Sequence, residues 1–198
     1  MVKFTTLLLA SVAVLAASTN AQELLEPRTF TPEQANVITL PHNKTLERRA
    51  TDGLTAKERK DILAIHNKYR ARHQAPDLKW NSKSATFGSN WIQACEFKHS
   101  GGPHGENLAA GFHDFKSAIK AWYDEVKDYN YGRPGFSSQT GHYTQVVWKG
   151  TSTIGCAKKK CPSYYIYICE YDSPGNIVTS DGSYFKKNVL PTIKNKNK

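Results

Sequence analysis

The sequence predicts an α+β fold in which an antiparallel sheet is packed between layers of helices. Helical periodicity is concentrated in the first part of the chain, and strand-like alternation in the last part. Helices followed by strands, without regular alternation of the two, are typical of α+β proteins, where helices cover the apolar faces of an antiparallel sheet. The sequence contains no internal repeat of the kind that indicates a solenoid or a propeller.

Three helices are predicted before residue 130. Thr55 and Glu58 have the spacing of a capping box, so the first helix should begin there and end before Pro76. The second helix should cover residues 82–97 and the third residues 114–129. The apolar side chains that recur at helical spacing are Ile62, Ile65 and Tyr69, then Ala85, Gly88, Trp91, Ile92 and Cys95, then Phe115, Ala118, Ile119, Trp122 and Val126.

Three strands are predicted after residue 140. The stretch GHYTQVVWKG, residues 141–150, alternates between two faces and is rich in the strand formers Val, Thr, Tyr and Trp. The stretches TIGCAKKK (153–160) and YYIYICEYD (164–172) are separated by Cys-Pro-Ser and are typical of a hairpin. We expect the chain after residue 176 to be irregular.

The first 21 residues predict secretion. A lysine at position 3 precedes an apolar run from 7 to 17, and small residues lie at 19 and 21. This pattern is typical of a secretory signal peptide, with cleavage expected after Ala21. The run is about half of the roughly 20 apolar residues that a bilayer span requires. We therefore expect an extracellular protein.

Residues 22–49 are predicted to be a pro-segment or a disordered leader. They have no sustained periodicity and end at Arg48 and Arg49, a dibasic pair of the kind that secretory endoproteases cleave. The alternative is a flexible extension that stays attached. The sequon at Asn43 lies within this leader, so its removal would also remove the glycan site.

The charge of the chain favours acidic partners outside the cell. The formal charge is +10, and residues 1–49 contain five Lys or Arg and four Asp or Glu, which leaves about +9 for the remainder. Such a charge favours anionic membranes, acidic glycans or microbial surfaces. The lysines are scattered and the compartment is extracellular, so nucleic acid is not expected. Residues 50–185 should form a single domain and residues 186–198 a basic, disordered tail.

Four cysteines in the predicted domain indicate two disulfides, because an even number in an oxidising compartment favours pairing. Their positions allow three connectivities. A zinc site of four thiolates is the alternative, but the paired C-x-x-C spacing of such sites is missing. The four are Cys95, Cys156, Cys161 and Cys169.

Six segments in order resemble the CAP superfamily of cysteine-rich secretory proteins, antigen 5 and pathogenesis-related 1 proteins. They are HNKYRARHQAPDLKWN, FKHSGG, HGENLA, AWYDEVKDYNY, GHYTQVVWKGTSTIGCA and YYIYICEYDSPGNIV, and the resemblance covers about residues 57–178. The four cysteines and the leader make the chain most similar to fungal secreted members of the pathogenesis-related 1 branch. The resemblance implies a three-layer α-β-α sandwich (CAP/SCP domain). We also expect a monomer.

The resemblance also implies a cavity lined by two histidines and two glutamates, His99, Glu106, Glu125 and His142. From this tetrad we expect a weak, open site for Zn²⁺ or Mg²⁺, with His99 and His142 as ligands. The alternative is a metal-free tetrad held by hydrogen bonds, and a histidine at a core-facing position such as 142 is often structural.

The disulfide pairs implied by the plant branch are Cys95–Cys161 and Cys156–Cys169. They agree with the positions of Cys156 and Cys169 on the two arms of the predicted hairpin, where the Cα separation of a disulfide can be met. Cys161 in the turn then remains for Cys95, at the end of the second helix.

The resemblance to fungal members implies binding of sterols, fatty acids or related small lipids, for export, defence or virulence. A loop between the third helix and the predicted strand of His142 carries Tyr129, Tyr131 and Phe136, the aromatic spacing of a caveolin-binding-like motif. Tyr129 could instead only pack on the third helix. Three aromatics in a Pro/Gly loop favour ligand contact.

Most family members are regarded as non-enzymatic, and we expect no catalysis. Ser100 lies beside His99, but the sequence contains neither H-E-x-x-H nor G-x-S-x-G. Two alternatives remain: a metal-dependent hydrolase or protease that uses the His/Glu cleft, and a precursor of a C-terminal signalling peptide released near Pro174, Gly175 and Asn176.

Overall fold

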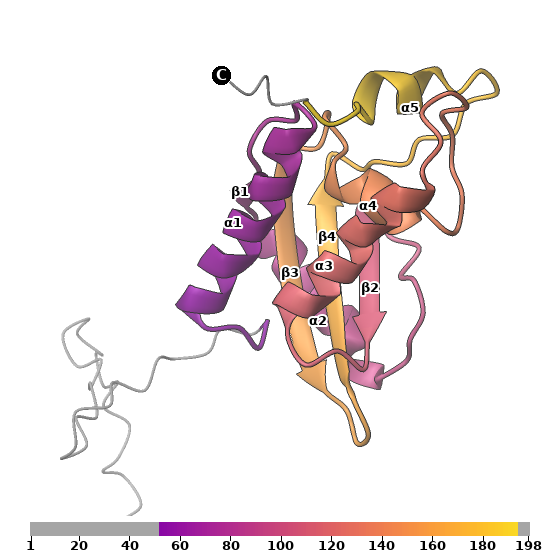
Figure 1. Ribbon diagram of the computed structural model, residues 1–198. Helices are drawn as coiled ribbons and strands as arrows, with labels where there is room; N and C mark the ends of the chain where they lie inside the picture. Colours follow the sequence, from indigo (N-terminus) through magenta and orange to yellow (C-terminus); the bar gives the residue numbers. More distant parts are fainter. Residues whose placement is uncertain (1–51, 194–198) are drawn as a thin grey trace, which may run out of the picture. The chain divides into compact units, whose positions relative to one another are not determined.

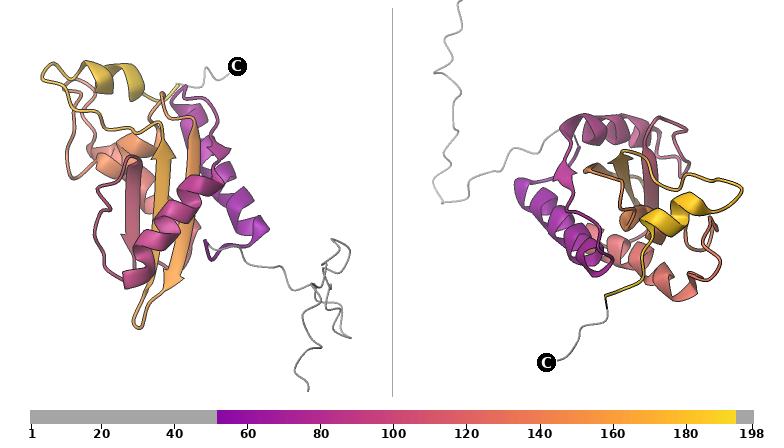
Figure 2. Two further views of the ribbon diagram at one scale, coloured as in Figure 1. Left: turned by 180° about the vertical axis from the view of Figure 1, so that it is seen from behind. Right: turned by 90° about the horizontal axis from the view of Figure 1, so that it is seen from above.

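A four-stranded sheet lies between helices on both of its faces in the computed structural model, which describes residues 52–193 (Figure 1). Helix α2 covers one face, and α1 and α3 cover the other (Figure 2). The predicted three-layer sandwich is therefore confirmed. In chain order the elements are α1 (Ala56–Arg72), β1 (Lys79–Trp80), α2 (Ser82–Trp91), η1 (Ile92–Ala94), β2 (Gly105–Ala110), α3 (Phe115–Asp124), η2 (Glu125–Asp128), α4 (Gly141–Val146), β3 (Thr153–Lys160), β4 (Tyr165–Asp172) and α5 (Ser183–Asn188).

The three long helices begin at side-chain caps. The predicted capping box of Thr55 and Glu58 is present at the start of α1. Asn81 caps α2 and Asp114 caps α3 through their side-chain oxygens. Helix α2 is shorter than predicted: it ends at Trp91, and the chain turns at Cys95, which has a left-handed backbone conformation. No helix within residues 52–193 is long and apolar enough to cross a membrane.

The sheet has the order β1-β3-β4-β2. Strands β3 and β4 form the predicted antiparallel hairpin, and β2 pairs antiparallel with β4 on its other side. Strand β1 pairs in parallel with β3, so the sheet is antiparallel except at this edge. Two residues are too few to produce an alternation pattern, which explains why the sequence did not predict β1.

Strand β4 lies inside the sheet, and its side chains pack into both layers of core. Ile166 and Ile168 belong to a small cluster on the α2 side, whereas Tyr167 and Tyr171 belong to the larger cluster on the α1 and α3 side. The two disulfides pair as the family resemblance implied. Cys156–Cys169 joins opposite residues of β3 and β4 with a Cα separation of 4.1 Å, and Cys95–Cys161 ties the end of η1 to the hairpin turn at 5.8 Å.

The prediction of a strand over residues 141–150 is wrong, because residues 141–146 form helix α4. The N–H of Val147 donates to the carbonyl of Tyr143 at 3.2 Å, as in a helix. Every residue from 143 to 148 is buried, so the apparent alternation does not separate a core face from a solvent face. The carboxylate of Glu125 accepts the N–H groups of His142 and Tyr143, both at 3.0 Å, and thereby caps the helix. This cap comes from a residue 17 positions earlier, beyond the reach of local sequence patterns.

The end of the chain is also more ordered than predicted. Helix α5 lies in the stretch expected to be irregular, and it crosses the domain boundary that we placed after residue 185. Val189 is buried, and the N–H of Ile193 donates to the carbonyl of Arg72 at 2.9 Å. Residues 186–193 therefore belong to the folded unit. The predicted signal peptide, the leader and residues 194–198 lie outside the described residues.

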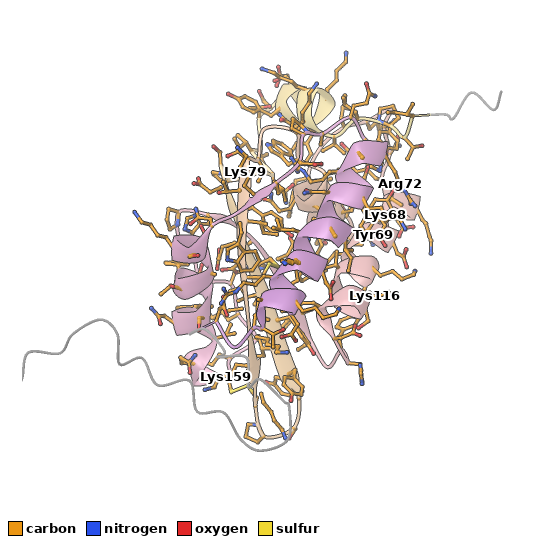
Figure 3. The ribbon with its side chains drawn as sticks, turned by 90° about the vertical axis from the view of Figure 1, so that its left-hand side faces the viewer. Lys68, Tyr69, Arg72, Lys79, Lys116 and Lys159 are labelled. Carbon is orange, nitrogen blue, oxygen red and sulfur yellow. A yellow bond between two sulfur atoms is a disulfide. The ribbon has the colours of Figure 1, made fainter. Side chains whose placement is uncertain are left out.

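Lysine side chains are spread over separate elements on the face seen in Figure 3. Lys68 lies on α1, Lys79 on β1, Lys116 on α3 and Lys159 on β3. The same face shows Tyr69, whose ring stacks on that of Tyr123 with centroids 3.8 Å apart. Positive charge on this face is thus distributed over several elements.

Candidate functional site

The first His–Glu pair joins the loop after η1 to the start of β2. Nδ1 of His99 lies 2.5 Å from Oε1 of Glu106. The N–H of Ser100 donates to both oxygens of the same carboxylate, at 3.1 and 3.2 Å. The hydrogen bond to Glu106 raises the pKa of His99. Burial opposes ionisation of Glu106, but the hydrogen bonds from His99 and Ser100 outweigh it and lower the pKa of this carboxyl group.

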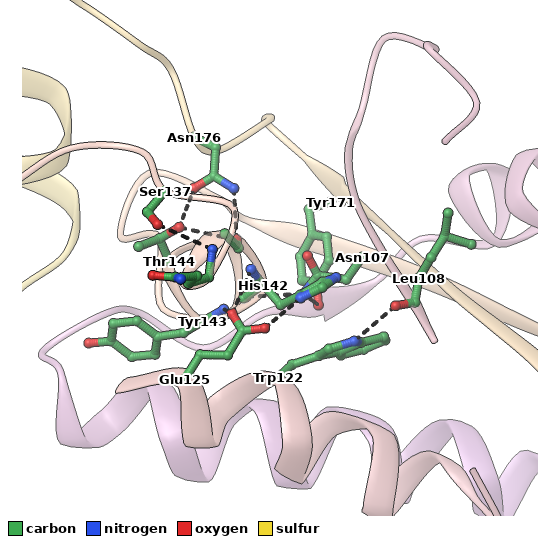
Figure 4. Close-up of polar contacts among 12 residues, drawn as sticks. Asn107, Leu108, Trp122, Glu125, Ser137, His142, Tyr143, Thr144, Tyr171 and Asn176 are labelled. Carbon is green, nitrogen blue, oxygen red and sulfur yellow. Dashed lines mark hydrogen bonds and ion pairs between the residues drawn. The ribbon is translucent and has the colours of Figure 1, made fainter. Parts of the chain in front are cut away.

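The second pair joins η2 to the start of α4 (Figure 4). Nδ1 of His142 lies 2.6 Å from Oε1 of Glu125, while Oε2 accepts the two backbone N–H groups that cap α4. The imidazole of His142 stacks on Trp122 with ring centroids 6.0 Å apart and planes inclined by 17°. Trp122 is fixed in turn, since its Nε1 donates to the carbonyl of Leu108 at 3.1 Å. Packing and hydrogen bonding therefore hold His142 in one orientation.

Asn107 links the two pairs. It follows Glu106 on β2, and its Nδ2 donates to the carbonyl of His142 at 3.1 Å and to the hydroxyl of Tyr171 at 3.3 Å. Figure 4 shows Asn107 beside His142 and Tyr171. Consecutive residues of a strand point to opposite faces of a sheet, so Glu106 and Asn107 extend in different directions from the same edge strand.

The tetrad is thus built as two His–Glu pairs. Between residues 52 and 193, no group of three or more His, Cys, Asp or Glu side chains is arranged to hold a metal ion. Each imidazole uses Nδ1 for its glutamate, which leaves Nε2 as the nitrogen available to a ligand. A carboxylate on the far nitrogen is the usual partner of a metal-bound histidine. Two imidazoles, each with an Nε2 that its glutamate does not engage, are the donors that the pairs offer, and within the described residues they do not join other side chains in a closed site of three or four ligands.

Glu170 is a site residue that the sequence analysis missed. It lies directly opposite Glu106 in the β2–β4 ladder and is fully buried. Burial and the neighbouring carboxylate of Glu106 raise the pKa of Glu170 to about 9, so its carboxyl group is neutral at pH 7. A glutamate within the apolar strand YIYICEYD was the signal that could have revealed it.

The three aromatics of the predicted sterol loop differ in exposure. Tyr129 is 7% exposed and packs against Tyr143 with its ring tilted by 59°, so it belongs to the core. Tyr131 is 37% exposed, and its hydroxyl lies 2.6 Å from that of Tyr143. Phe136 is 54% exposed and covers Gly141, where a Cβ atom would come within 3.0 Å of the phenyl ring. Only Tyr131 and Phe136 are therefore accessible to a ligand.

A cavity of about 530 Å³ lies between this loop and the segment that leads into α5. Its apolar walls include Phe136 from the loop and Val178 and Phe185 from the C-terminal segment. Arg133 and Asp181 add one charge of each sign. The C-terminal segment was predicted to be irregular, so its contribution to this cavity was not anticipated.

A second cavity, of about 440 Å³, lies between α1 and the start of α3. Ile62, Ile65 and Phe115 supply its apolar surface. Lys57 and Lys116 also line it, together with acidic residues of the same two helices. This groove is therefore apolar at its floor and charged at its rim.

Comparison with protein families matches residues 63–171 to the cysteine-rich secretory protein family, CAP. Among curated proteins, the chain is 42% identical over 146 residues to "Repressed by EFG1 protein 1" of Candida albicans, covering 68% of this chain and 54% of that protein. It is 43% identical over 144 residues to "Secreted protein RBT4" of the same organism, covering 65% of this chain and 39% of that protein. Pathogenesis-related protein 1 of Arabidopsis thaliana is 38% identical over 125 residues, covering 60% of this chain and 78% of that protein. The chain thus spans about half or less of the two Candida proteins.

Solved structures share the fold. Venom allergen-like protein 4 of Schistosoma mansoni superposes with a TM-score of 0.53 at 26% identity, over 66% of this chain and 99% of that one. A structure described as NaASP2 with Zn²⁺ gives a TM-score of 0.59 at 24% identity, over 74% of this chain and 92% of that one. The second likeness concerns the fold alone.

Proposed function

Because the chain belongs to the cysteine-rich secretory protein (CAP) family, we propose that it is a secreted, non-enzymatic protein that binds sterols or related small lipids. The cavity between the loop of residues 130–140 and the α5 segment is the observation that carries this proposal. Its volume of about 530 Å³ lies within the range of small-molecule sites. Such a protein would act in lipid export, defence or virulence.

A sterol is rigid, almost wholly apolar and carries one hydroxyl group, and the cavity has matching features. Phe136, Val178 and Phe185 offer apolar surface, whose burial against a ligand contributes about 25 cal/mol per Å². Arg133 and Asp181 are polar side chains that can hydrogen-bond a hydroxyl group. A rigid ligand also loses little conformational entropy on binding.

The two His–Glu pairs favour a structural or metal-holding role over catalysis. Both oxygens of Glu125 are occupied, one by the imidazole of His142 and the other by the N–H groups that start α4. A carboxylate held in this way supports the fold and orients the histidine. We propose that His99 and His142 provide a weak site for Zn²⁺ or another divalent cation, which would supply a Lewis acid when bound.

The groove between α1 and α3 supports a second ligand class, fatty acids. An acyl chain can lie along Ile62, Ile65 and Phe115, and the ammonium group of Lys116 can meet a carboxylate at the rim. This site is separate in its lining residues from the cavity beside α5.

Sterol binding is tested with labelled sterol in detergent micelles. Phe136→Ala combined with Val178→Ala should weaken binding at least about tenfold, because both side chains line the cavity and are exposed enough to be removed without disturbing the core. Phe97→Ala combined with Tyr165→Ala is the matched control, since both residues are exposed and neither lines the cavity. Wild-type affinity in the cavity variant would refute this site.

The broader loop variant, Tyr131→Ala with Phe136→Ala, should abolish sterol binding, because it removes one lining side chain and the Tyr131–Tyr143 hydroxyl contact that holds the loop in place. His99→Ala with His142→Ala should leave it nearly intact, because neither histidine lines the cavity beside α5. Each variant must retain the wild-type circular dichroism spectrum and melting temperature. Peptide hydrolysis by wild type with added Zn²⁺ that is lost with Glu106→Gln and Glu125→Gln would instead favour the hydrolase alternative.

A further inference from the structure

Exposed apolar side chains surround the cavity beside α5. Val178 is 69% exposed and Phe136 is 54% exposed, and both line the cavity. Ile177 and Tyr184, next to lining residues in the chain, are 40% and 45% exposed. The two segments are in close contact, because a Cβ atom on Gly182 would lie 2.4 Å from the carbonyl oxygen of Pro134. These side chains therefore form one surface around the cavity.

Positive charge accompanies this apolar surface. Phe185 and Asn188 are the buried residues of α5, which leaves Lys186 and Lys187 on its exposed side. Lys149 is adjacent, since its N–H donates to the carbonyl of Asn188 at 3.0 Å, and Arg133 lines the cavity. The acid among the lining residues is Asp181, whose pKa is lowered to about 2 by hydrogen bonds led by the N–H of Ser183. The surface thus has excess positive charge.

We propose that this surface docks on a bilayer that contains anionic phospholipids, so that sterol enters the cavity directly from the membrane. We name it the α5 surface and define it by Phe136, Ile177, Val178, Tyr184, Lys186 and Lys187. Apolar and aromatic side chains flanked by lysines are the composition of interfacial membrane-binding surfaces. Each lysine near an anionic leaflet contributes about 1 kcal/mol.

The proposal rests on the proposed function, because it explains how a ligand that is almost insoluble in water reaches its site. A bilayer suits the α5 surface better than an acidic glycan, which would be bound by the lysines without using the exposed Val178 and Phe136. The opposite end of the sheet is the turn between β3 and β4 (Figure 1), and membrane contact there would leave the cavity remote from the bilayer.

Co-sedimentation with vesicles of phosphatidylcholine, with and without phosphatidylserine, tests the proposal. Lys186→Gln combined with Lys187→Gln should weaken binding to the anionic vesicles about 30-fold, the loss expected for two lysines. Lys98→Gln combined with Lys160→Gln is the matched control. It removes the same charge from exposed residues beside the β3–β4 turn, which the Cys95–Cys161 disulfide ties to the segment of Lys98. The control should bind as wild type does.

Tyr184→Ser should also weaken vesicle binding, because it removes an aromatic ring at the expected interface without removing charge. Equal loss in both lysine variants would show attraction by net charge alone and would overturn the proposal. So would unchanged binding in the Lys186/Lys187 variant, or binding to heparin but not to vesicles.

The two proposals fail separately. Sterol binding in detergent micelles should be the same in wild type and in both lysine variants, because these lysines do not line the cavity. Vesicle binding without sterol binding would refute the proposed function and leave the docking surface in place. Sterol binding in micelles without vesicle binding would refute the docking surface.

Discussion

The hydroxyl oxygens of Tyr131 and Tyr143 lie 2.6 Å apart, which fastens the loop of residues 130–140 to the core. Tyr143 is fully buried and packs edge-on against His73 and Tyr123. Burial raises the pKa of both tyrosines, so both hydroxyls stay protonated at neutral pH. Tyr131 therefore has a structural role in addition to its exposed ring, whereas Phe136 has no such anchor.

Tyr131→Phe should separate these two roles. It removes the hydroxyl contact and should lower the free energy of unfolding by about 1 kcal/mol, while sterol affinity changes less than about threefold because the ring remains. Phe136→Ala should do the reverse, with nearly unchanged stability and weaker sterol binding. Urea denaturation and sterol titration of both variants check this. A large loss of affinity in Tyr131→Phe would mean that the hydroxyl itself binds the ligand.

Arg70→Met should be strongly destabilising. Arg70 is fully buried, and its guanidinium group donates to four backbone carbonyls, at 2.8 to 3.1 Å. Burial lowers its pKa to about 10, and the group remains charged at pH 7. Methionine would leave these carbonyls unsatisfied, at a cost of about 3–5 kcal/mol in the free energy of unfolding. The carbonyls belong to Pro76, Val146, Trp148 and Thr151.

Lys68→Met is the control for Arg70→Met. It removes one positive charge from an exposed position of the same helix and should change the free energy of unfolding by less than about 0.5 kcal/mol. Urea denaturation at pH 7 compares the two. Similar losses in the free energy of unfolding for Arg70→Met and Lys68→Met would contradict the role assigned to Arg70.

Glu170→Gln should stabilise the protein increasingly as the pH rises. The folded-state pKa of Glu170, about 9, lies above its usual value of 4.5, so the folded protein binds this proton more tightly than the unfolded chain does. The contribution of Glu170 to the free energy of unfolding therefore falls between about pH 4.5 and pH 9. Glutamine mimics the neutral acid at every pH, and the variant should exceed wild type by about 1–3 kcal/mol at pH 8.

Urea denaturation at pH 5 and pH 8 measures this difference. The control variant is Glu96→Gln, at an exposed position. Its free energy of unfolding relative to wild type should not increase as the pH rises. A constant difference between Glu170→Gln and wild type would mean that Glu170 is ionised in the folded protein at both pH values.

Zn²⁺ affinity should fall as the pH falls from 8 to 6. The hydrogen bond to Glu106 raises the pKa of His99 above its usual value of 6.5. As the pH falls, the imidazole therefore takes up a proton earlier than a free histidine would, and the protonated ring can no longer coordinate a metal. Calorimetry with wild type should give at least about tenfold tighter binding at pH 8 than at pH 6. His142→Ala should lose most of this binding, and His113→Ala should not, because the His113 side chain is 97% exposed and lies outside both His–Glu pairs. Equal heats from wild type and His142→Ala would leave the two pairs with a structural role only.

The sequence by itself determined those parts of the fold whose causes lie close together along the chain. The capping box of Thr55 and Glu58 involves residues three positions apart, and the structure starts α1 there. The hairpin of β3 and β4 was predicted from two alternating runs around a short turn, and both strands form. The family resemblance added the disulfide pairs and the identity of the two histidines and two glutamates.

Only the tertiary structure decided how these residues act together. Residues 141–146 become a helix because Glu125 caps them from another element. Residues 143–148 are all buried, so their alternation in sequence does not distinguish a core face from a solvent face. The histidines and glutamates form two pairs, and the burial of Glu170 beside Glu106 follows from strand register. The cavity beside α5 exists because segments far apart in the sequence come together: Phe136 and Val178, which both line it, are 178 − 136 = 42 residues apart. Such contacts depend on the folded path of the chain, since local patterns report only the interactions between neighbours in sequence.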